Sequence, residues 1–243
     1  MSEDSPDKSA PITRPGTEPA TRSAPQEIAA FLDKAAALPA EGVRRGRLVF
    51  ALDATLSRQP TWDRAQHLQA EMFEEAARIG TLNVQLVYFR GFGECRASRF
   101  VADTRSLARL MAGIDCRGGR TQIERVLRHA LATTREERVD ALVYVGDAME
   151  ERADDLCAAA GELAIHGTRL FLFQEGEDPA VSRTFAEMAR LSGGAHVRFD
   201  AGAAARMAEL LRAVGAYAAG GLDALERLGT TNAEARALLS QLK

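Results

Sequence analysis

The chain has 243 residues, of which 46% are hydrophobic and 27% charged, a composition typical of a globular protein rather than a disordered one. Its 31 basic and 34 acidic residues are well mixed and give a formal net charge of −3, which argues against a dedicated nucleic-acid binder. The three cysteines lack C-x-x-C spacing, and no stretch approaches the roughly 18 apolar residues of a membrane span. We therefore expect a cytoplasmic protein with reduced thiols that binds neither nucleic acid nor membrane.

The chain is expected to contain one compact domain with extensions at both ends. Residues 1–25 hold five of the eight prolines among polar residues, which predicts a disordered tail. Residues 26–42 are expected to form a short helix and a linker. The main domain is assigned to residues 43–222, and residues 223–243 to a C-terminal helical extension.

Strands and helices alternate along most of the predicted domain. Strands are expected at 48–52, 82–89, 94–100, 140–146, 169–174 and 195–199. Helices are expected at 26–38, 60–79, 104–112, 121–131, 150–166, 178–191, 203–219 and 232–242. Two further signals mark helix starts: Thr121 and Glu124 have the spacing of a capping box, and Asp178 precedes Pro179.

This alternation predicts an α/β fold with a doubly wound, mostly parallel six-stranded sheet and helices on both faces. The expected strand order is 3-2-1-4-5-6, and only the third strand should be antiparallel, because Gly91 and Gly93 leave room only for a tight turn before it. The residues predicted to fill the core are Val49, Phe50, Leu52, Leu86, Val87, Val143, Val145, Leu170 and Leu172.

The first strand ends in a group of oxygen-bearing side chains. The stretch LVFALDATLS runs from Leu48 to Ser57, and its apolar residues stop at Asp53, with hydroxyls at Thr55 and Ser57. Ligands of doubly wound folds sit at the carboxyl ends of the strands. A carboxylate and two hydroxyls are hard donors, which suit Mg²⁺ or Mn²⁺ better than Zn²⁺.

Two later segments carry polar residues at comparable places. Thr121 follows the Gly118-Gly119 loop, and Asp147 follows the fourth strand. Taken singly, Thr121 and Asp147 can each be explained as helix caps. If the strand order reverses between the first and fourth strands, however, both loops converge with Asp53 over one crevice.

Together these residues resemble the von Willebrand factor A-type (VWA, integrin I-like) domain, whose metal-ion-dependent adhesion site (MIDAS) carries D-x-S-x-S, then a Thr, then an Asp. The resemblance covers about residues 47–217. It implies that the metal is held by Asp53, Thr55, Ser57, Thr121 and Asp147. The chain departs from the family pattern twice: Thr55 replaces the usual first Ser, and Arg120 stands where a Gly usually precedes the Thr.

The resemblance implies a protein-binding module in which Mg²⁺ or Mn²⁺ is completed by an Asp or Glu of a partner, such as an AAA+ ATPase or another multiprotein complex. A metal-independent VWA scaffold is the alternative within this fold. A haloacid-dehalogenase-like phosphotransferase would need an acid at position 55, where the chain has Thr55. Because the set contains no evident general base or nucleophile, we expect a binding protein and not an enzyme.

Overall fold

The computed structural model describes residues 45–58, 82–102, 106, 109, 111–199 and 204–242. All of them belong to one compact unit, Val43–Lys243. The predicted tail at 1–25 and the predicted helices at 26–38 and 60–79 lie outside the described residues. The assignment of the main domain to 43–222 and of an extension to 223–243 stays a prediction.

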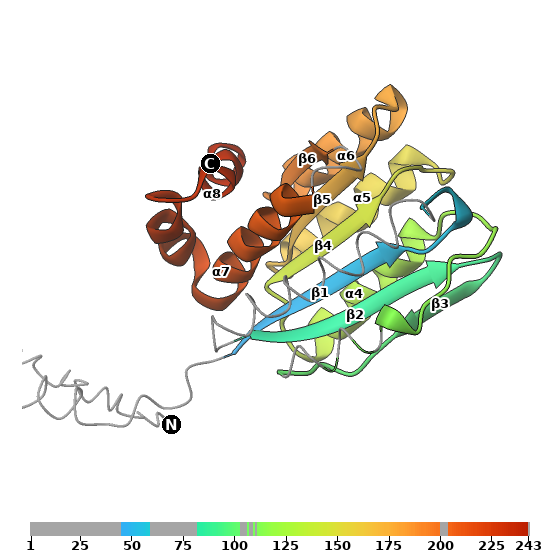
Figure 1. The fold of residues 1–243 in the computed structure, drawn as a ribbon, viewed down its shortest axis with the longest axis horizontal. Coiled ribbons are helices and arrows are strands. Elements are labelled where there is room, and N and C mark those ends of the chain that lie inside the picture. The colour runs from blue at the N-terminus through green and yellow to red at the C-terminus, as the bar shows by residue number, and fades with distance from the viewer. Residues whose placement is uncertain are drawn as a thin grey trace, which may run out of the picture. The chain divides into compact units, whose positions relative to one another are not determined.

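Six strands form one sheet in the order β3-β2-β1-β4-β5-β6 (Figure 1). The strands are β1 (Gly46–Asp53), β2 (Leu82–Arg90), β3 (Glu94–Ala97), β4 (Ala141–Gly146), β5 (Arg169–Glu175) and β6 (Ala195–Phe199). Only β3 is antiparallel to its neighbour. The predicted strand order and direction are therefore confirmed, although β3 is shorter than predicted.

The described helices follow the predicted alternation. They are α4 (Ile123–Glu136), α5 (Ala153–Ile165), α6 (Pro179–Ser192), α7 (Ala204–Gly229) and α8 (Ala233–Gln241), with a short 3-10 turn η1 (Leu56–Arg58) after β1. The start of α6 is confirmed, because the Asp178 carboxylate accepts a hydrogen bond from the Ala180 backbone N–H at 2.7 Å. In the segment predicted as a helix at 104–112, the described residues 106, 109, 111 and 112 are helical.

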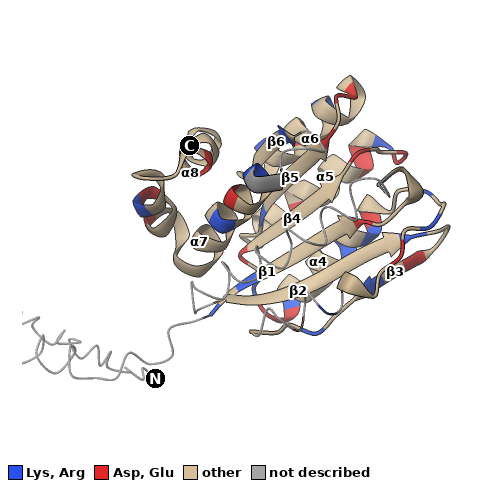
Figure 2. Cartoon of the chain, viewed as in Figure 1, with Lys and Arg blue, Asp and Glu red and all other residues tan. Residues whose placement is uncertain are grey.

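The sheet is covered on both faces because side chains alternate along its strands. From β1, Phe50 and Leu52 face a core shared with α7 and α8, whereas Val49 and Ala51 face a core shared with α4, α5 and α6. All nine predicted core residues are buried. Figure 2 shows the central strands uncharged along most of their length, with the charged residues on helices and loops.

The C-terminal helices differ from the prediction. The expected helix end at residue 219 coincides with a break in α7, because Gly220 and Gly221 have non-helical backbone. A second helical part, which was not among the expected helices, then continues to Gly229. Leu225, in the part after this break, is buried in the same apolar cluster as Phe50. In the described part of the chain, no helix is long and apolar enough to cross a membrane.

The chain reverses direction across the sheet between β1 and β4. The strand that follows β1 in the chain pairs on one side of it, and β4 pairs on the other. In open α/β sheets this reversal leaves a crevice at the carboxyl ends of the two strands. Asp53 is the last residue of β1, and Asp147 directly follows β4.

Candidate functional site

The first site loop follows β1 and is held by its own side chains. Asp53 is fully buried, and its Oδ1 accepts a hydrogen bond from the Thr55 backbone N–H at 2.8 Å. Such an Asx turn fixes the carboxylate relative to the residues after it. The hydroxyl oxygens of Thr55 and Ser57 lie 3.0 Å apart. The alternating D-x-T-x-S pattern therefore gathers its oxygens in one place.

Asp147 lies beside this loop because β1 and β4 are parallel neighbours. Leu52 pairs with Val145, so Asp53 and Asp147 follow the paired ends of adjacent strands. The Oδ1 atom of Asp147 is buried and has no hydrogen-bond partner among the described residues. A buried carboxylate oxygen without a donor is costly, which indicates that it normally meets a cation or water.

The loop that carries Thr121 packs against both the first loop and the β2–β3 turn. The Arg117 backbone N–H donates to the Ala54 carbonyl at 3.0 Å, and the Arg120 backbone N–H donates to the Gly91 carbonyl at 3.1 Å. A side chain at Gly119 would collide with the Gly91 backbone. This close approach explains the need for glycine in the loop.

Thr121 connects its loop to the segment that follows β4. Its hydroxyl donates a hydrogen bond to Glu151 Oε2 at 2.5 Å and accepts one from the Glu150 backbone N–H at 2.9 Å. The Thr121 backbone N–H also donates to Glu150 Oε2 at 3.1 Å. Contacts thus run from the β1 loop through the Thr121 loop to the β4–α5 loop, so the three predicted loops converge.

The predicted capping box at the start of α4 is wrong. The N-cap position is occupied by Gln122, which makes no capping side-chain bond. Instead, the Ile123 backbone N–H donates to Glu151 Oε1, and the Glu124 carboxylate pairs with Arg128 one turn later. A carboxylate from another loop therefore takes the place that a local cap would fill.

Asp147 does not cap the next helix either. Helix α5 begins at Ala153 rather than 150, its N-cap position is Arg152, and no side chain caps it. The Asp147 carboxylate is therefore not used as a helix cap and stays available for a ligand at the crevice.

The similarity of this chain to known proteins lies in its three-dimensional structure. No model of a known protein family matches the sequence, and no curated protein sequence does. Among solved structures, the chain is similar to the SpRpn10 VWA domain, with 11% identity, a TM-score of 0.54, and coverage of 67% of this chain and 94% of that one. The domain has the von Willebrand factor A fold.

Two other structures of this fold come from longer chains. One is the pilus adhesin SpaC from Lactobacillus rhamnosus GG, at 9% identity and a TM-score of 0.59, with 74% of this chain and 31% of that chain covered. The other is proximal thread matrix protein 1 from the mussel byssus with a zinc-occupied MIDAS motif, at 12% identity and a TM-score of 0.54, covering 72% and 48%. The present chain therefore spans less than half of either of these.

The donor set at this crevice suits a hard divalent cation. Adjacent ligands in an octahedral Mg²⁺ shell of about 2.1 Å radius lie about 3 Å apart, which is the separation of the Thr55 and Ser57 hydroxyls. The same distance also suits a hydrogen bond between them. No three His, Cys, Asp or Glu side chains in the described ranges could hold a metal by themselves, so the hydroxyls are needed.

A cavity of about 440 Å³ opens beside the site. It is lined by Arg120, Thr121, Glu150 and Glu151. The Arg120 guanidinium makes no ion pair with any described residue. The exposed Arg117, in contrast, pairs with Glu94, with 3.9 Å between its guanidinium nitrogen and the Glu94 carboxylate oxygen. The hydrogen bond from Arg90 holds the pKa of the Glu94 carboxyl below its ordinary value, with further contributions from Arg96 and Arg117. The cavity itself is lined by one arginine and two glutamates, so both signs of charge face it.

Sequence reasoning missed the two glutamates of the β4–α5 loop. The sequence pattern places Glu150 and Glu151 at the start of a helix, yet both carboxylates accept hydrogen bonds from Thr121, and that of Glu151 also accepts one from the Ile123 backbone N–H. The only available signal was their position three and four residues after Asp147, next to a strand end. Two half-buried histidines lie away from this loop: His129 contacts Gln85, and His196 contacts Gln174.

Proposed function

We propose that this VWA domain is a protein-binding module in which Mg²⁺ or Mn²⁺ is held by Asp53, Thr55, Ser57, Thr121 and Asp147. The observation that carries the proposal is the convergence of three loops on one crevice, with a fully buried Asp53 and an Asp147 oxygen that lacks a donor among the described residues. Bound there, the cation would supply a positive charge with open coordination positions.

The chain's own residues supply the other half of the proposed recognition. Mg²⁺ needs six oxygens, and the five residues leave room for an outside ligand. A partner Asp or Glu is the natural ligand, and Arg120, which lines the cavity and makes no ion pair with a described residue, favours the same negative charge. Partners of this kind include an AAA+ ATPase or another multiprotein complex. We propose binding without a catalytic step.

Thermal melts with Mg²⁺, Mn²⁺ or EDTA test the proposal. A cation at ten times its dissociation constant should stabilise the domain by about 1.4 kcal/mol, which raises the Tm by roughly 3 to 6 °C. Asp53→Asn should abolish the shift. The exposed Asp223→Asn removes one carboxylate elsewhere and should keep it.

The alternative is a metal-independent VWA scaffold. It is favoured by the bonds that the site's polar groups make among themselves, such as Thr121 to Glu151 and Thr55 to Ser57. Identical melts in all three solutions would support this scaffold and reject the metal site. Phosphate release that is lost in Asp53→Asn would instead support a phosphotransferase.

A further inference from the structure

The Thr121 hydroxyl has a limited number of hydrogen bonds to make. A threonine hydroxyl offers one proton and two lone pairs. The hydroxyl donates its hydrogen bond to Glu151 Oε2 at 2.5 Å, and one lone pair accepts a hydrogen bond from the Glu150 backbone N–H at 2.9 Å. One lone pair of the Thr121 oxygen therefore remains for a cation, provided that the hydroxyl continues to donate its hydrogen bond to Glu151.

Glu151 is itself held firmly enough to do this. Its second oxygen, Oε1, accepts the backbone N–H of Ile123, the first residue of α4. A carboxylate anchored at a helix N-terminus is stabilised by the helix dipole as well as by the hydrogen bond. Its orientation toward Thr121 is thus set by both loops.

We propose that Glu151 is a positioning residue: it accepts the hydrogen bond that the Thr121 hydroxyl donates and thereby keeps an oxygen lone pair of Thr121 available to the metal. This inference rests on the proposed function, because it needs the cation to bind. Partners beyond the direct ligands often orient metal ligands in this way, and their loss typically costs about 10- to 100-fold in metal affinity.

Glu150 provides a matched control within the same loop. It carries the same charge and also reaches Thr121, but its carboxylate accepts the backbone N–H rather than the hydroxyl proton. Glu150→Gln therefore removes a negative charge near the site without changing the direction of the hydroxyl. A pure charge effect would make the two glutamates equivalent.

The substitution Glu151→Gln separates the two effects. The amide oxygen of glutamine can still accept the Ile123 N–H, so the start of α4 keeps its cap. Its NH₂ group then faces the Thr121 hydroxyl and donates to it, which occupies the remaining lone pair. Glu151→Asp keeps the charge but is one methylene too short to reach both partners.

Titration calorimetry with Mn²⁺ on the full chain is the test. We expect Glu151→Gln to weaken Mn²⁺ binding by about 10- to 100-fold. Glu151→Asp should also weaken it, although the charge is kept, and Glu150→Gln should change it by no more than about threefold. Melts in EDTA should show that each variant folds; if Glu151→Gln does not fold, Glu151→Asp decides.

A double-mutant cycle then shows whether Glu151 acts through Thr121. In a Thr121→Ala background, Glu151→Gln should cost no more than Glu150→Gln does, because no hydroxyl remains to be oriented. Equal losses for Glu151→Gln and Glu150→Gln, or an undiminished loss in the Thr121→Ala background, would overturn the inference and leave the metal site standing. If the wild-type chain binds no Mn²⁺, the proposed function and the inference fail together.

Discussion

Gly119 is the residue at which the loop that carries Thr121 packs against the β2–β3 turn. A methyl group there would stand 2.1 Å from the Gly91 carbonyl oxygen, which is far inside van der Waals contact. Since the Gly91 atoms that the methyl group would meet are all backbone, they cannot rotate away as a flexible side chain could. The position of the next residues, Arg120 and Thr121, therefore depends on the absence of a side chain at this point.

We predict that Gly119→Ala destabilises the domain by about 1 to 3 kcal/mol, the usual cost of overpacking. It should also weaken Mn²⁺ binding, because Thr121 is displaced. The control is Gly161→Ala within α5, where a methyl group meets nothing within 4 Å and should stabilise by about 0.5 to 1 kcal/mol. Urea unfolding measures both changes, and an unaltered midpoint for Gly119→Ala would contradict the prediction.

Among the elements, those defined by a continuous or periodic apolar pattern could be predicted from the sequence. The apolar run before Asp53 predicted β1. The apolar stripe of the segment that forms α4 predicted its buried face, which includes Ile123, Val126 and Leu127. The cap of α4 could not be predicted, because Glu151 reaches it from another loop. Spacing along the chain reports local hydrogen bonds and says nothing about contacts made through the fold.

The break in α7 shows a second limit of pattern reading. The helix is expected to end at residue 219, and the two residues that follow, Gly220 and Gly221, do have non-helical backbone, with a positive φ of 66° at Gly221. The helix resumes after them because Leu225 is buried against the core. Tertiary burial, rather than helix propensity, decides this segment, which is why local signals missed it.

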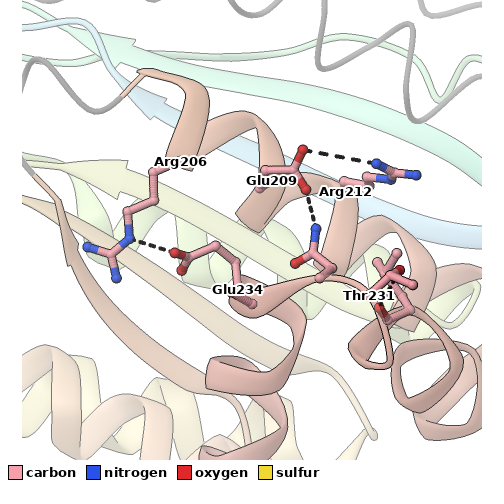
Figure 3. Close-up of a pocket in the computed structure, with 8 residues that line it drawn as sticks. Arg206, Glu209, Arg212, Thr231 and Glu234 are labelled. Atoms are coloured by element: carbon pink, nitrogen blue, oxygen red, sulfur yellow. Dashed lines mark hydrogen bonds and ion pairs between the residues drawn. The ribbon is translucent and has the colours of Figure 1, made fainter.

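Asn232 is the N-cap residue of α8, and its side chain bonds both α8 and α7. Its Oδ1 accepts the Ala235 backbone N–H at 2.8 Å, and its Nδ2 donates to Glu209 of α7. Residues of α7, of α8 and of the turn between them line a pocket of about 560 Å³. Figure 3 shows this pocket, where Glu209 also approaches Arg212, and Arg206 pairs with Glu234.

We predict that Asn232→Ala destabilises the domain by about 1 to 2 kcal/mol, because α8 loses its cap and α7 loses a hydrogen bond. The neighbouring Thr231→Ala is the control, since its exposed hydroxyl makes only a long bond of 3.4 Å to the Leu228 carbonyl. Guanidinium unfolding followed by circular dichroism measures the change. A Thr231→Ala loss as large as that of Asn232→Ala would count against the capping role.

At the scale of the whole molecule, two half-buried histidines link stability to pH. Burial lowers the pKa of His129 and of His196 below the ordinary value of about 6.5. Below that value the unfolded chain binds protons that the folded chain resists. The stabilising contribution is therefore present above about pH 6.5 and is lost as the pH falls through the folded pKa.

We predict that the Tm falls between pH 7.5 and pH 5.5, and that the double variant His129→Gln, His196→Gln shows a smaller fall. The exposed His166→Gln is the control and should leave the pH profile of wild type. Melts in EDTA keep metal binding out of the comparison. A double variant with the wild-type profile would show that other groups control the acid response.

The pairing of β1 with β4 makes the separation of Asp53 and Asp147 a property of strand register. Consecutive residues of a parallel strand advance about 3.3 Å, so a slip of two residues between Leu52 and Val145 would move one acid past the other by about 6.6 Å. A slip of one residue would exchange the side chains that β4 presents to the two cores, so that Leu142 and Tyr144 would have to fit where Val143 and Val145 now pack. The distance between the two carboxylates is consequently fixed by apolar side chains that never touch the crevice. Core substitutions that loosen this register, made well away from any ligand, should therefore change the affinity for a cation.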